Sequence, residues 1–179
     1  MFVQPWDAAL DDAERRAWIA DGHDFGQLCV NGLPGRPPAV VTTHFTADGD
    51  RLLIHLARPH PVWQAVEHDA NVTFTVIGDY AFIPGPWRAK PGTPPTDGVP
   101  TSYYAAVRFT CRAAIVDDPE AKAELLRRRL ARFQPDGDHA PVAHRTDVAG
   151  RLTSRGQALD VPTARGQLRR LDRVGPWQP

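Results

Sequence analysis

The chain has 179 residues, and its 21 Lys and Arg balance 21 Asp and Glu, so the formal net charge is zero. A hydrophobic share of 42% with 23% charged residues is ordinary for a globular protein and excludes wholesale disorder. No apolar run approaches the roughly 20 residues of a membrane span, and the N-terminus lacks the basic and apolar regions of a signal peptide. With two cysteines, which make neither a disulfide framework nor a zinc site, we expect a cytoplasmic protein without membrane contact.

The hydrophobic pattern predicts short strands followed by a closing helix. Turn residues separate the apolar runs, which are rich in β-branched side chains. Prolines at 61 and 119 suit the first position of a helix. In chain order the predicted elements are a helix at 11–20, strands at 25–30, 38–45 and 51–57, a helix at 61–68, strands at 71–77 and 80–83, a strand at 103–116 and a helix at 118–133.

Two of these strands alternate with period two, so each has an apolar face. Within 51–57 the alternation groups Leu52, Ile54 and Leu56 on one face and Leu53, His55 and Ala57 on the other. Within 103–116 it groups Val107, Phe109, Cys111 and Ala113 against Arg108, Thr110 and Arg112. The pattern favours a mainly β, α+β fold: a small antiparallel β-barrel with peripheral helices.

Two segments lack a predicted helix or strand. Residues 84–100 hold six prolines and three glycines, and a loop of this length inside a compact domain is more often functional than idle. Beyond residue 133 the periodicity fades. We therefore expect a barrel domain over 1–133 and a divergent Arg-, Pro- and Gly-rich tail over 134–179, partly disordered.

The charge is distributed unevenly along the chain. Residues 1–126 carry 10 basic and 16 acidic residues, whereas residues 127–179 carry 11 and 5. The densest basic stretch is Arg127, Arg128 and Arg129 with Arg132, which on a helix is usually a solvated face. Since no helix-turn-helix pattern is present, any DNA binding is expected to be weak, phosphate-driven and salt-sensitive.

The sequence lacks the signatures of common enzyme classes. It contains no G-x-G-x-x-G, P-loop, H-E-x-x-H or G-x-S-x-G motif, and its two serines lie outside any nucleophile elbow. The pattern alone therefore assigns no enzyme class.

One segment resembles a known family. Residues 55–63, HLARPHPVW, are similar to the G-H-x-A-R-x-N-P-x-W segment of the PaiB-like family, the FMN-binding negative transcriptional regulators. Four further pieces follow the family's order: MFVQP at 1–5, FGQL at 25–28, GDYAFIPGPW at 78–87 and VPTSYYAAV at 99–107.

The resemblance implies an FMN-binding split barrel, usually a homodimer whose cofactor pockets lie at the subunit interface. An FMN phosphate needs cationic or N–H donors, and its ring needs apolar walls. The cofactor-binding residues that the resemblance implies are His55, Arg58, His60, Trp63, Trp87, Thr101 and Tyr103. Arg58 would bind the phosphate, Thr101 would offer a hydroxyl, and Trp63, Trp87 and Tyr103 would wall the ring.

Each candidate also has a structural interpretation. Arg58 suits a solvated surface position, Trp63 suits packing of a helix on the barrel, Trp87 suits a hydrophobic plug of its loop, and His55 suits a core histidine. The resemblance leaves a second cofactor open, because the piperazate synthases, haem enzymes that form an N–N bond, are similar across this motif. There His55 would be the axial iron ligand.

The chain departs from the family pattern at several positions. Ile54 replaces the glycine before the histidine, and its bulk favours FMN over haem only if it shares the face of His55, which alternation argues against. The closing K-L-S-Q-N motif has no counterpart, and one hypothesis is a change of reading frame in the tail. A cofactor-free remnant is therefore a third interpretation.

Overall fold

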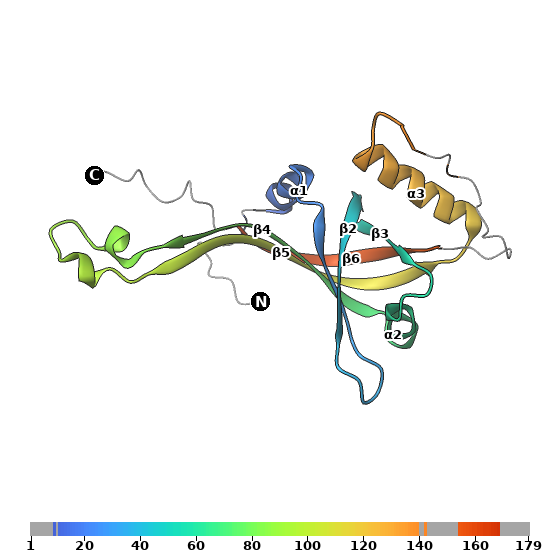
Figure 1. Ribbon diagram of the computed structural model, residues 1–179, viewed down its shortest axis with the longest axis horizontal. Helices are drawn as coiled ribbons and strands as arrows, with labels where there is room; N and C mark the ends of the chain where they lie inside the picture. The colour runs from blue at the N-terminus through green and yellow to red at the C-terminus, as the bar shows by residue number, and fades with distance from the viewer. Residues whose placement is uncertain (1–8, 10, 140–141, 143–153, 169–179) are drawn as a thin grey trace.

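Hydrogen bonding between neighbouring strands closes the sheet into a barrel (Figure 1). The computed structural model describes residues 9, 11–139 and 142, and residues 154–168 as backbone. In these described segments, six antiparallel strands follow the order β1-β2-β3-β6-β5-β4 around the barrel. They are β1 (Phe25–Val30), β2 (Ala39–Asp48), β3 (Arg51–Ala57), β4 (Asn71–Ile83), β5 (Thr101–Val116) and β6 (Ser154–Leu168). The predicted antiparallel barrel is confirmed.

Within the described residues, three α-helices surround the barrel: α1 (Asp12–Ala20), α2 (Val62–His68) and α3 (Pro119–Phe133). The Asp11 carboxylate accepts a hydrogen bond from the Glu14 N–H at the start of α1, and Asp118 does the same for Ala121 at the start of α3, so both helices have N-caps. Pro61 is the N-cap of α2 rather than its first residue. No helix in the described ranges is long and apolar enough to span a membrane.

The barrel interior is filled by the apolar face of each strand. Phe45 and Phe74 are fully buried, and their rings meet edge to face with centroids 5.0 Å apart. Leu52 and Ile54 of β3 point into the same core, as their alternation predicts. Both α1 and α2 contribute buried residues to this cluster, so the helices are held by apolar packing as well as by their caps.

The two strands predicted at 71–77 and 80–83 are one strand. β4 continues through Gly78 and Asp79, with a shift of register against β5 between Ile77 and Tyr80. A Cβ atom on residue 78 would overlap the Trp18 side chain, so glycine permits β4 to pass close to α1.

β6 lies where the sequence predicts no element. It pairs with β3 from Arg51↔Asp160 to Ala57↔Ser154 and with β5 on its other side. Both edges of this strand are therefore hydrogen-bonded to neighbours, which compensates for glycines and a proline that break its apolar alternation. The closed barrel includes residues on both sides of residue 133.

The outer parts of β4 and β5 form a hairpin that projects from the barrel (Figure 1). We call residues 78–104 the arm. Its strands pair from Tyr80↔Tyr104 to Ile83↔Thr101, and its tip holds the short 3-10 helices η2 (Gly85–Arg88) and η3 (Pro95–Asp97). A Cβ atom on Gly98 would overlap the Gly85 carbonyl oxygen, so these glycines let the two turns of the tip pack together.

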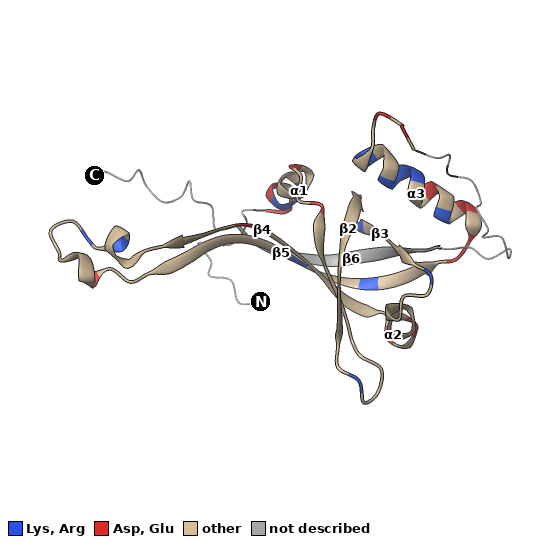
Figure 2. Cartoon of the chain, in the orientation of Figure 1, with Lys and Arg blue, Asp and Glu red and all other residues tan. Residues whose placement is uncertain are grey.

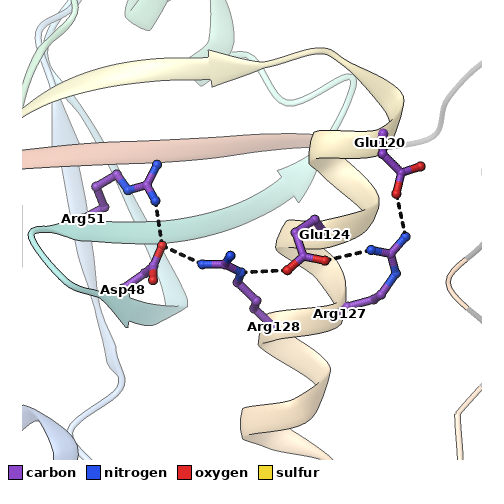
Figure 3. A network of polar contacts seen from close by, with 6 residues as sticks. All are labelled: Asp48, Arg51, Glu120, Glu124, Arg127 and Arg128. Carbon is purple, nitrogen blue, oxygen red and sulfur yellow. Dashed lines mark hydrogen bonds and ion pairs between the residues drawn. The ribbon is translucent and has the colours of Figure 1, made fainter.

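A charged network joins α3 to the β2–β3 turn (Figure 3). Arg128 donates to Asp48 and to Glu124, each at 2.9 Å, and Asp48 also accepts from Arg51 at 2.9 Å. These side chains are substantially exposed, so each pair contributes only about 0–1 kcal/mol to stability.

Candidate functional site

The turn between β3 and α2 is fixed by hydrogen bonds to its own backbone. The Ala57 carbonyl oxygen accepts from the His60 N–H at 3.0 Å and from the Trp63 indole N–H at 2.9 Å. The Val62 N–H donates to Nδ1 of His60 at 3.2 Å. Arg58 lies exposed in this ordered turn, so its guanidinium is presented at the end of β3.

His55 lies on the outer face of β3, beneath α3. Ile54 points the other way and has 0% exposure in the core, so its bulk does not lie on the face of His55. Arg129 of α3 donates to the carbonyl oxygens of His44 and Leu53 at 2.9 and 3.3 Å. Nε2 of His55 is buried and makes no hydrogen bond with the residues that the structure describes. This imidazole nitrogen therefore has an unused lone pair or proton.

The surroundings of His55 favour its neutral form. Desolvation lowers its pKa below the ordinary value of 6.5, and the positive charge of Arg129 adds to the effect. Burial also lowers the pKa of the Arg129 guanidinium, because desolvation penalises any charged group.

We expect His55 to make folding sensitive to acid. Below about pH 6.5 the unfolded chain takes up a proton that the folded chain binds less readily, so the free energy of unfolding falls with falling pH. The His55→Gln variant lacks this contribution, and its stability should depend less on pH between about 5 and 7. Urea unfolding across this pH range measures the free energy of unfolding, and an NMR titration of the imidazole ring measures the pKa of His55. A His55 pKa above 6.5 would contradict the prediction.

The other candidates on the barrel differ in their surroundings. Trp63 is 2% exposed and belongs to the core cluster, so packing of α2 on the barrel accounts for its position. His60 is half-buried in the turn, with Nδ1 engaged by the Val62 N–H.

The remaining candidates lie on the arm. Thr101 and Tyr103 are half-buried at the start of β5, and Trp87 lies in η2 with 66% of its surface exposed. The interpretation of Trp87 as a hydrophobic plug of its loop is wrong, because the Pro-rich segment forms 3-10 turns that leave the ring outside. The seven candidates thus form two groups, one at the end of β3 and one on the arm.

The basic stretch of α3 makes contacts within the chain. Arg127 and Arg128 pair with acidic side chains. Arg129 binds backbone carbonyls, and Arg132 lies 3.5 Å from Asp24. Figure 2 shows basic and acidic residues interspersed along this helix. The exposed positions of Arg127, Arg128 and Arg132 agree with the solvated face that the sequence indicates, whereas Arg129 is half-buried.

A cavity of about 660 Å³ opens between α1 and the β2–β3 turn. None of the seven candidate residues is among its described lining residues. No sequence motif predicts this cavity, because its lining residues come from segments that are far apart in the chain.

The comparisons with known proteins place the chain in a family. Residues 1–158 match the family model described as "Putative FMN-binding domain". The chain therefore belongs to this FMN-binding domain family, which confirms the family and the flavin cofactor class expected from the sequence. No curated protein matches the chain in sequence. The motif at residues 1–5 lies outside the described residues.

Solved structures share the fold. The flavocytochrome Anf3 from Azotobacter vinelandii has a TM-score of 0.71 at 21% identity, over 94% of this chain and 72% of its own. The FAD and heme binding protein from Mycobacterium smegmatis has a TM-score of 0.69 at 16% identity, over 96% of this chain and 81% of its own. At these identities the likeness establishes the split-barrel fold.

The residues at the end of β3 fit the chemistry of a flavin phosphate. Arg58 supplies a guanidinium, which binds phosphate with paired N–H donors, and the hydrogen-bonded turn fixes the backbone that carries it. The same region also fits haem, since His55 offers a buried imidazole nitrogen without a hydrogen bond in an environment that favours the neutral ring.

Proposed function

We propose that this protein is a homodimeric FMN-binding protein. Each site would be formed by the β3–α2 turn of one copy and the arm of the other. Arg58 would bind the phosphate, His55 and His60 would border the flavin, and Trp87, Thr101 and Tyr103 would come from the second copy. We also propose that the protein is cytoplasmic, as expected from its two cysteines.

The exposed apolar surface of the arm is the main support for the dimer. Within the arm, Tyr80, Phe82 and Trp87 are 57–66% exposed. Residues 80–87 carry no charge, and the charged residues of the arm lie mainly towards its tip (Figure 2). Tyr80 and Phe82 are two residues apart on β4, so they share one face. A neighbouring set of large apolar side chains of this kind usually marks an interaction site.

FMN retention on gel filtration tests the cofactor assignment. We expect a flavin absorption band to co-elute with the wild type. Arg58→Ala should weaken FMN affinity about 10- to 100-fold, the range for losing a charged hydrogen bond of about 1.5–3 kcal/mol, and His55→Ala should change it little. Arg36→Ala, another exposed arginine, is the matched control. Equal retention by the Arg58 and Arg36 variants would contradict the proposed phosphate site.

Haem is the second candidate, supported by the buried Nε2 of His55. Reconstitution with haemin would then produce a sharp Soret band that His55→Ala abolishes while Arg36→Ala leaves it intact. A Soret band of this kind, with no retained flavin, would replace the flavin proposal. Retention of neither cofactor would instead support the remnant interpretation.

The regulator role of the PaiB-like proteins is a weaker part of the proposal. DNA binding would depend mainly on phosphate contacts, and the arginines of α3 already contact acidic groups and carbonyls of the chain. Any binding should therefore disappear at high salt. Gel-shift binding that persists in high salt would contradict this view.

A further inference from the structure

The cavity between α1 and the β2–β3 turn lies away from the proposed flavin site. Gly49, Arg51 and Leu52 line it at the start of β3, whereas Arg58 follows the end of that strand. The seven residues of β3 span about 20 Å at about 3.3 Å each. The volume of about 660 Å³ falls within the range of small-molecule sites.

The cavity combines an apolar floor with a charged rim. Ile19, Phe45, Leu52 and Phe109 contribute buried core side chains to it. Successive turns of α1 supply Arg15, Arg16 and Ile19 along one face, a spacing of three to four residues. A ligand here would bury an apolar body and keep a polar group beside the arginines.

The charges that line the cavity include more basic than acidic groups. Four arginines (Arg15, Arg16, Arg51 and Arg132) accompany three aspartates (Asp12, Asp24 and Asp50). Each aspartate already has an arginine within 3.5 Å. A guanidinium carries five N–H donors and accepts nothing, so donors exceed acceptors among these lining residues, with Arg51 also donating to Asp48 outside the lining.

Arg15 has unused hydrogen-bonding capacity in a largely buried position. Its side chain is 19% exposed and, among the described residues, binds only one oxygen of Asp12, at 2.9 Å, a carboxylate that also binds Arg16. Nε of Arg15 is buried without a partner in the described part of the chain, as is the hydroxyl of Thr46, which lines the same cavity. Two residues of the cavity lining thus each hold a buried polar atom without a described partner, although buried polar groups are normally hydrogen-bonded.

We propose that this cavity binds a small apolar carboxylate, separately from the flavin. The carboxylate accepts hydrogen bonds from Arg15 and Thr46, and the apolar body packs on Phe45, Leu52 and Phe109. The arginines repel a cationic ligand. A neutral analogue binds more weakly because it offers the Arg15 guanidinium no negative charge.

Calorimetric titration of the full chain with phenylacetate tests the site, with phenethylamine and 2-phenylethanol as cationic and neutral probes. We expect phenylacetate to bind one per chain and at least about tenfold more tightly than either analogue. Arg15→Gln should weaken it at least about tenfold, and Thr46→Val by a smaller factor. Arg127→Gln, an exposed arginine of α3, is the control and should bind as the wild type.

FMN retention separates this site from the flavin site. The Arg15→Gln variant should retain FMN as the wild type does, and Arg58→Ala should bind phenylacetate normally. Binding of phenethylamine as tight as that of phenylacetate would overturn the proposal. So would unchanged phenylacetate affinity in a folded Arg15→Gln variant, or displacement of phenylacetate by FMN, which would make the cavity part of the flavin site.

Discussion

The Tyr80→Ser, Phe82→Ser double variant is expected to be monomeric and to lose FMN. Both side chains are more than half exposed in the single chain, so their replacement should not disturb the barrel. Burial of one such side chain in an interface contributes about 1.5–3 kcal/mol. Losing two therefore weakens association by about 3–6 kcal/mol, or roughly 100- to 20,000-fold, and FMN retention should fall with it because the site needs the second copy.

Sedimentation velocity over a concentration series measures this effect. Val40→Ser is the matched control, because Val40 is 58% exposed but lies on β2, outside the arm. A double variant that remains dimeric would contradict the interface, as would a wild type that is monomeric at micromolar concentration.

The Phe74→Ala variant is expected to lose about 3–5 kcal/mol of unfolding free energy, the usual cost of a large cavity in a core. Phe74 is fully buried and meets Phe45 edge to face. Since domains of this kind are stable by only about 5–15 kcal/mol, this one substitution should remove a large part of the total.

Urea unfolding at one fixed protein concentration measures the loss, because dimerisation makes apparent stability depend on concentration. Phe25→Ala is the comparison, since Phe25 is 49% exposed and its ring touches His44 from outside. That control should cost less than about 1 kcal/mol. Equal losses in the two variants would contradict the assignment of the barrel interior.

The strands whose apolar face lies inside the barrel could be predicted from sequence. In β3 and β5 the inward-facing side chains, such as Ile54 and Val107, are buried or partly buried in the core cluster, so the apolar face of each strand can be recognised in the sequence. β6 could not be predicted from the sequence. Its place between β3 and β5 is set by pairing with strands distant in the chain, and local composition does not show such pairing. Because glycine also marks turns, the sequence predicts two strands separated near Gly78, where the structure has an irregularity within one strand.

The site could be predicted only in pieces. The family resemblance identified residues at the end of β3 and on the arm, but one copy of the chain does not bring Arg58 and Trp87 into one pocket. Burial of Trp63 in the core depends on how α2 packs, which spacing alone does not specify. The cavity beside α1 depends on contacts between residues more than 30 positions apart, such as Arg16 with Asp50. A local sequence motif cannot predict contacts of this kind.

Subunit mixing of two single variants tests the shared flavin site most directly. Arg58→Ala damages the turn and Trp87→Ala damages the arm, so each homodimer alone should lose FMN. In a mixed dimer one site would combine an intact turn with the partner's intact arm, and the other would carry both substitutions. An equal mixture in which half of the dimers are mixed should therefore regain about a quarter of the wild-type FMN. No recovery in verified mixed dimers would contradict a site shared between two copies.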